Sequence, residues 1–119
     1  MKKKILLSDD SVFMRGVLTD ILTNEGYHLI EEAGNGADAV RLYSEWHPDL
    51  VFMEAVLPEM NGIHALKAIM AADADAAVIM CSTVGLRDVV AEALNGGAKD
   101  YIFKPFSAER VLDAVRKHI

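Results

Sequence analysis

Short apolar runs alternate with helix-like patterns along the whole chain, and this alternation limits the possible folds more than any other feature. Each run has the length of a buried strand and is followed by apolar residues at helical spacing. The predicted strands are Ile5–Leu7, Leu29–Ala33, Leu50–Glu54, Ala77–Ser82 and Tyr101–Phe103. A first helix is predicted to begin after Asp9-Asp10-Ser11 and end near Glu25, with further helices over about 37–46, 62–71, 86–94 and 108–118.

Five β–α units with short links predict right-handed crossovers and a parallel sheet that is covered on both faces. A chain of 119 residues is too short for a closed eight-stranded barrel. We therefore predict an α/β fold of the flavodoxin-like (βα)5 type, an open doubly wound parallel sheet with strand order 2-1-3-4-5. No linker or internal repeat divides the chain, so residues 1–119 are expected to form one domain.

Composition excludes several classes of function. The net charge of −6 disfavours nucleic acid as a direct partner, because duplex binding depends on Lys and Arg. The single cysteine, Cys81, cannot form an internal disulfide and lies in an apolar run, as expected of a buried, inert thiol in a reducing compartment. The apolar run after Lys2-Lys3-Lys4 is too short for a signal peptide, and none approaches a membrane span of about 20 residues. We expect a cytoplasmic protein that does not insert into membranes.

Polar and charged residues stand at the carboxyl ends of four predicted strands. The first strand is followed by Asp9 and Asp10, the third ends in Glu54, the fourth ends in Ser82, and the fifth is followed by Lys104. Because the carboxyl ends of parallel strands meet at one edge, these side chains are predicted to share a cleft.

The chemistry of that cleft suits phosphoryl transfer. Three clustered carboxylates repel one another unless a cation joins them, and oxygen-only ligands favour Mg²⁺. Lys104 and Ser82 can donate hydrogen bonds to phosphoryl oxygens, which is the electrostatic stabilisation that phosphoryl transfer requires. A carboxylate can itself accept a phosphoryl group covalently.

These residues resemble a response-regulator receiver domain, in particular a stand-alone chemotaxis-type (CheY-like) one. The matching pieces span essentially the whole chain in the family's order and spacing. They are Asp9-Asp10-Ser11, Pro58-Glu59-Met60-Asn61-Gly62, Ser82, Gly97-Ala98-Lys99-Asp100-Tyr101 and Lys104-Pro105-Phe106. The resemblance implies a single-domain response regulator of a two-component phosphorelay, with no output domain, that signals by binding partners and is not an enzyme.

The resemblance also implies a role for each residue of the cleft. Asp9 and Asp10 match the family's acidic pair. The implied Mg²⁺ ligands are Asp10, Glu54, the backbone carbonyl of Val56 and, through a water, Asp9. Lys104 matches the lysine that contacts the phosphoryl oxygens, and the bond that follows it, to Pro105, is cis in such domains.

Switching and partners follow from the same resemblance. Ser82 matches the hydroxyl that moves toward the phosphoryl group on activation, and Tyr101 matches the aromatic ring that then turns inward. The face formed by the fourth helix, fifth strand and last helix, which carries Val89, Val90, Tyr101 and Val111, is the implied output surface. The implied partners are a histidine kinase upstream and a signalling or motor-switch protein downstream. We expect a monomer, with a dimer as the alternative.

One departure from the family matters most. Glu54 occupies the phosphoacceptor position, where the family normally has an aspartate. Its extra methylene displaces the carboxylate, and small misplacements are costly for in-line transfer, so we expect little or no ordinary phosphorylation. Glu54 then either mimics the phosphorylated state by reaching Lys104 or Ser82, or marks a receiver that switches without phosphate. A natural glutamate and a deliberately introduced one would look the same.

Two smaller departures and two rival functions complete the analysis. Ser8 is predicted to be a tolerated polar strand end, and Thr83 to face solvent. A Mg²⁺-dependent phosphatase or phosphotransferase of α/β type is the first rival, although no second acid stands two residues after Glu54. Flavin binding is the second rival, although the acids of the 9–12 segment would repel a phosphate.

Overall fold

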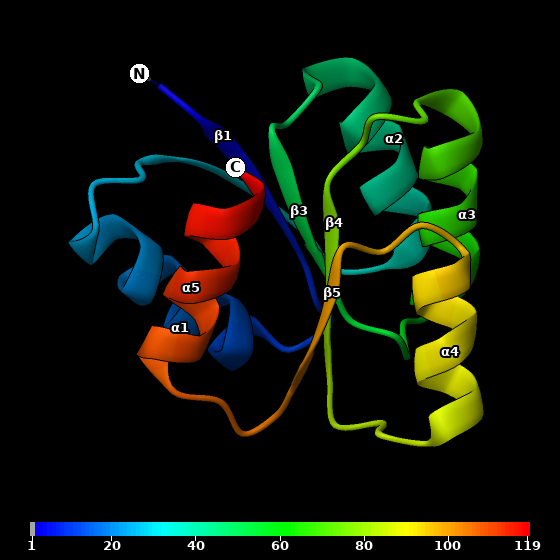
Figure 1. Cartoon of the computed structure of the whole chain (residues 1–119). Coiled ribbons are helices and arrows are strands. Elements are labelled where there is room, and N and C mark those ends of the chain that lie inside the picture. The colour runs from blue at the N-terminus through cyan, green and yellow to red at the C-terminus, as the bar shows by residue number, and fades with distance from the viewer. Residues whose placement is uncertain (1) are drawn as a thin grey trace.

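The computed structural model describes residues 2–119, in which five strands alternate strictly with five helices (Figure 1). The strands are β1 (Lys4–Ser8), β2 (Leu29–Ala33), β3 (Leu50–Met53), β4 (Val78–Ser82) and β5 (Asp100–Phe103). The helices are α1 (Val12–Asn24), α2 (Gly36–Trp46), α3 (Gly62–Ala72), α4 (Arg87–Asn95) and α5 (Ala108–His118). Most predicted boundaries agree with these to within one residue.

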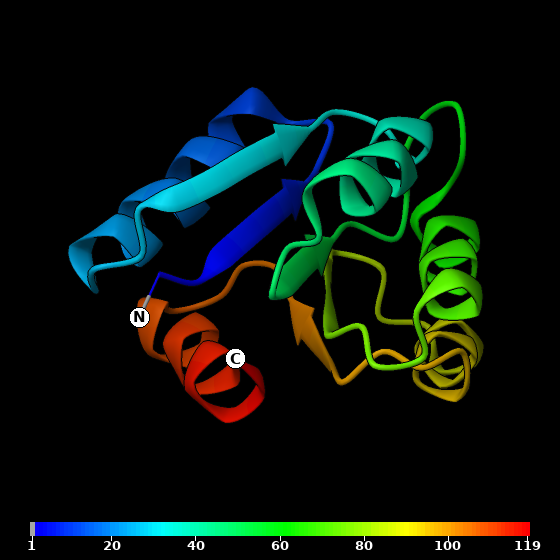
Figure 2. The same ribbon diagram turned by 90° about the horizontal axis from the view of Figure 1, so that it is seen from above.

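The strands form one parallel sheet in the order β2-β1-β3-β4-β5, which confirms the predicted flavodoxin-like topology. Helices α1 and α5 cover one face of the sheet, and α2, α3 and α4 cover the other (Figures 1 and 2). Within residues 2–119, none of the helices has the length and apolar character needed to span a bilayer.

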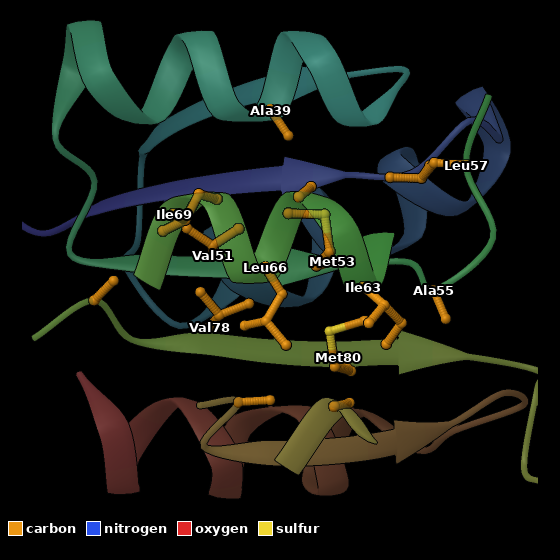
Figure 3. Packing of buried hydrophobic residues seen from close by; sticks show 14 of the residues in the cluster. Ala39, Val51, Met53, Ala55, Leu57, Ile63, Leu66, Ile69, Val78 and Met80 are labelled. Carbon is orange, nitrogen blue, oxygen red and sulfur yellow. The ribbon is translucent and has the colours of Figure 1, made fainter. Parts of the chain in front are cut away.

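The central strands are buried on both faces, as their continuous apolar runs predict. Along β3, Leu50 and Phe52 pack into the core under α1 and α5, whereas Val51 and Met53 pack into the core under α2 and α3 (Figure 3). The outer strand β2 is mostly exposed, which explains its weaker apolar pattern. The two hydrophobic cores thus lie on either side of β1, β3 and β4. The polar residues at the carboxyl ends of the strands lie beyond these cores.

Four helices are preceded by a residue whose side chain accepts a hydrogen bond from the backbone N–H three residues further on. These N-cap residues are Ser11, Asn35, Asn61 and Ser107, and each satisfies one of the free N–H groups of a helix start. Helix α4 differs, because Leu86 at its N-cap makes no side-chain hydrogen bond. In α4 only Ala93 is fully buried, so this helix is the one least fixed by packing.

Ser8 ends β1 inside the protein, and its hydroxyl has no hydrogen-bond partner among residues 2–119 although the residue is only 2% exposed. A buried polar group without a partner costs free energy, whereas an apolar replacement of similar size does not. We expect Ser8→Ala to raise the free energy of unfolding by about 1 kcal/mol, measured by urea denaturation. The buried Leu6→Ala, as a control, should lower it by about 2–5 kcal/mol. A clear loss of stability in Ser8→Ala would contradict this prediction.

Candidate functional site

Lys104 lies between two buried carboxylates at the carboxyl edge of the sheet. Its Nζ is 2.6 Å from Oδ2 of Asp9 and 2.9 Å from Oε1 of Glu54, so one ammonium bridges both acids. The three side chains are each at most 9% exposed. Because these residues follow β1, β3 and β5, the interaction connects the ends of three strands that are far apart in the sequence.

The second oxygen of each buried carboxylate also has a donor. Oδ1 of Asp9 accepts the N–H of Ser11 at 2.9 Å, and Oε2 of Glu54 accepts the N–H of Val56 at 3.2 Å. Buried charges are tolerated when they are paired and hydrogen-bonded, and this arrangement meets both conditions. Glu54 therefore reaches Lys104, one of the two alternative contacts predicted for a phosphoryl mimic.

The main chain fixes where these side chains start. The N–H of Glu54 donates to the carbonyl of Ser8 at 2.9 Å, and the N–H of Lys104 donates to the carbonyl of Ser82 at 2.9 Å. Gly62 at the start of α3 packs directly on Glu54, since a Cβ there would lie 1.8 Å from the Glu54 carbonyl oxygen. Only glycine allows this close approach, which gives the sequence signal at Asn61-Gly62 a structural reason.

Ser82 and Tyr101 both bind the backbone of Val84. The Ser82 hydroxyl accepts the N–H of Val84 at 3.1 Å, and the Tyr101 hydroxyl donates to the Val84 carbonyl at 2.6 Å. Tyr101 is only 5% exposed, so its ring is turned inward. The segment between β4 and α4 is thus held at Val84 by the two residues that the family resemblance assigns to switching.

Burial and charge shift the pKa of three groups around the cleft. For Lys104, burial by itself lowers the pKa, but the hydrogen bonds and negative charges of Asp9 and Glu54 outweigh it, so the pKa is raised. Burial is also the main cause of the raised pKa of Tyr101. Burial raises the pKa of the Cys81 thiol to about 12, which agrees with the predicted inert cysteine.

The expected metal ligands are only partly brought together. Asp9 and Glu54 both face Lys104, while Asp10 and Val56 are exposed. Throughout residues 2–119, no three His, Cys, Asp or Glu side chains are arranged so that they could hold a metal ion. The donor chemistry nevertheless suits Mg²⁺, because every candidate ligand is a hard oxygen.

The surface formed by α4, β5 and α5 is here called the output face. Val111 and Tyr101 are buried, and Val89 and Val90 are half-buried, so these residues contribute mainly to the core. The large exposed apolar residues of this face and its flanks are Leu86, Leu94 and Phe103. Thr83 is exposed, which confirms that it faces solvent, and the Lys104–Pro105 peptide bond is cis, as the resemblance implied.

Sequence reasoning missed two contributors to the site. The backbone of Val84 joins Ser82 to Tyr101, and no sequence signal identifies a backbone donor and acceptor. Arg15 in α1 donates to the carbonyl of Asp9 at 2.6 Å. A cation close to the positive N-terminal end of a helix is unfavourable by itself, and this was a usable signal that Arg15 has a specific partner.

Comparisons with known proteins agree on one family. A model of the response regulator receiver domain matches residues 5–116. Chemotaxis protein CheY of Bacillus subtilis is 50% identical over 117 residues, which cover 98% of each chain. CheY of Thermotoga maritima is 49% identical over 117 residues with the same coverage. A chain in the crystal structure of the CheX–CheY–BeF3–Mg²⁺ complex from Borrelia burgdorferi is 38% identical with a TM-score of 0.93, covering 97% of this chain and 87% of that one.

Removing the Lys104 ammonium should leave the two buried carboxylates without the cation that they share. We expect Lys104→Met to lower the free energy of unfolding at pH 7 by about 3–5 kcal/mol in urea denaturation. Since the folded state raises the pKa of Lys104, its contribution is complete below the unfolded value of about 10.4 and is lost as pH rises through the folded value. The difference between parent and variant should therefore narrow above about pH 10.4.

The exposed Lys67 is the matched control, because its 2.7 Å pair with Glu92 lies at the surface. Lys67→Met should cost less than about 1 kcal/mol. Equal effects of the two substitutions, or a difference that widens at alkaline pH, would contradict the assignment of Lys104 as the buried bridging cation.

Proposed function

The chain belongs to the response regulator receiver family, and from that premise we propose that it is a single-domain regulator in which Glu54 stands in for the phosphorylated side chain. CheY-like members of this family are signalling proteins and not enzymes. The observation that most supports the proposal is the 2.9 Å contact between Glu54 and Lys104. In phosphorylated relatives, as the resemblance implies, that lysine contacts the phosphoryl group.

The mimicry we propose is partial. A carboxylate carries one negative charge and two oxygens, whereas a phosphoryl group carries a charge of roughly −1.5 to −2 and three acceptor oxygens. Glu54 uses one oxygen on Lys104 and the other on the N–H of Val56. The Ser82 hydroxyl accepts the N–H of Val84, and the Glu54 carboxylate bonds Lys104 and the N–H of Val56, so this carboxylate supplies one of the two contacts that a phosphoryl group would make.

We infer Mg²⁺ as the cofactor, held by Asp10, Glu54, the carbonyl of Val56 and, through a water, Asp9. Three carboxylates against the one ammonium of Lys104 give the cleft a formal charge of minus two, which favours a divalent cation. The hydrogen bonds from Lys104 to Asp9 and Glu54 mean that a cation must share these oxygens with the ammonium. When bound, Mg²⁺ supplies positive charge that neutralises the acids and any phosphoryl oxygens beside them.

The signal is proposed to leave through the output face. Tyr101 is held inward by Val84, whose backbone also binds Ser82, so the state of the cleft and the shape of the α4 region are physically connected. Leu86, Leu94 and Phe103 offer exposed apolar contacts there. A histidine kinase upstream and a signalling or motor-switch protein downstream are the proposed partners; the Borrelia complex, in which CheY is bound to CheX, supports partner binding as the mode of action.

Phosphorylation chemistry tests the role of Glu54. After incubation with a small-molecule acyl phosphate and Mg²⁺, we expect intact mass measurements to detect no phosphoryl adduct on the parent and one adduct on Glu54→Asp. The shorter side chain should restore the geometry for in-line transfer. Glu45→Asp, on the exposed side of α2, is the matched control and should remain unmodified. An adduct on the parent would refute the geometric argument, and none on Glu54→Asp would refute a phosphorelay site.

The position of the Tyr101 ring tests the mimicry. If Glu54 favours the inward ring through Lys104, then Glu54→Gln should weaken that ion pair and increase the population in which the ring is exposed. In NMR spectra, a soluble paramagnetic agent should therefore broaden the Tyr101 ring signals more in Glu54→Gln than in the parent. Glu45→Gln removes an exposed charge paired with Arg41 and should leave these signals unchanged. Equal broadening in the parent and in Glu54→Gln would favour a receiver that switches independently of this side chain.

A further inference from the structure

Arg15 is a charged residue in an unfavourable place. It lies near the N-terminus of α1, where the helix dipole repels positive charge, and its side chain is only 16% exposed. A largely buried guanidinium needs hydrogen-bond acceptors, since a charge removed from water is costly without them. The acceptors that Arg15 uses therefore indicate what it does.

Two acceptors, one just beyond β1 and one in β2, bind the Arg15 guanidinium. Nη1 donates to the backbone carbonyl of Asp9 at 2.6 Å, just beyond β1, and Nε donates to Oε1 of Glu32 in β2 at 2.7 Å. The planar fork of arginine can serve both acceptors at once, which the single ammonium of a lysine cannot do in the same geometry. Glu32 is half-exposed and pairs with the guanidinium from β2.

Every polar group of Asp9 consequently has a hydrogen-bond partner. Its N–H donates to the carbonyl of Ala33 at 3.0 Å, its carbonyl accepts from Arg15, and its carboxylate accepts from Ser11 and Lys104. The carbonyl bound by Arg15 belongs to the peptide unit that joins Asp9 to Asp10. Fixing that peptide unit fixes ψ of Asp9 and φ of Asp10, the two torsions that set the direction of Asp10 relative to Asp9.

We propose that Arg15 is a positioning residue for the acidic pair, with Glu32 as its anchor. Lys104 and the Ser11 N–H hold the Asp9 carboxylate, while Arg15 holds the peptide unit between Asp9 and Asp10, so that Asp10 faces outward, where a cation can approach. The functional importance of this orientation rests on the proposed function of the acidic pair. The positioning itself rests on the two hydrogen bonds and on the burial of the guanidinium.

The test compares Arg15→Lys, Arg15→Gln and Glu32→Gln with the parent. Arg41→Gln is the matched control, because Arg41 pairs with Glu45 and Asp38 on the exposed surface of α2. Backbone amide NMR signals of the 9–11 segment are recorded without metal, and urea denaturation reports overall stability. We expect large shifts of these signals in both Arg15 variants, smaller shifts in Glu32→Gln and none in Arg41→Gln. Arg15→Lys keeps the charge, so a shift there separates the fork geometry from charge alone.

Cation binding is the second readout. In a Mn²⁺ titration followed by paramagnetic broadening of the Asp10 amide, the apparent dissociation constant should rise about tenfold or more in Arg15→Gln, as for other residues that orient metal ligands. Lower stability with unchanged 9–11 amide signals would overturn the proposal, because Arg15 would then serve only packing. If no protein in the set binds Mn²⁺, the proposed metal site fails, while the metal-free amide signals still decide the role of Arg15.

Discussion

The ion pairs of Lys104 with Asp9 and Glu54 are the interaction on which the arrangement of the site depends. Removing three charged groups from water is expensive, and it is tolerated here because every carboxylate oxygen has a donor. Since the three residues follow β1, β3 and β5, correct pairing requires the whole sheet to be in register. The buried ammonium thereby connects the chemistry of the cleft to the global fold.

The sheet gives this cleft a rigid base and leaves its rim adjustable. β3 and β4 are buried on both faces, and glycine at position 62 lets α3 begin directly on the Glu54 carbonyl. On the other side, the segment from Thr83 to Leu86 is mostly exposed and leads into a helix with only Ala93 fully buried. A change at the strand ends can therefore shift the loop before α4, which is loosely packed, more easily than it can shift the sheet, which is tightly packed.

Sequence patterns predict the layers of this protein better than its contacts. The five strands, their order and the residues gathered at the carboxyl edge follow from apolar periodicity and the rules for parallel sheets. The partner of each side chain does not follow from them. That Lys104 bridges Asp9 as well as Glu54 and that Arg15 binds a carbonyl are both set by distances between elements far apart in the sequence. The role of Val84 is harder still to predict, because its contacts are made by backbone groups, which every residue type has.

The contacts of Glu54 bear on how strongly one carboxylate can bias a switch. Two sites are coupled only to the extent that a ligand interacts differently with the two states. Glu54 contacts Lys104 directly, but it reaches Tyr101 only through the main chain at Ser82 and then Val84. The charge of Glu54 lies near Lys104 whether the Tyr101 ring is turned inward or outward. Glu54 can therefore favour the inward ring only through the contacts at Ser82 and Val84 that differ between the two ring positions. A phosphoryl group with a further oxygen for Ser82 would act on that relay directly, and this is why the carboxylate is expected to shift the equilibrium only partway.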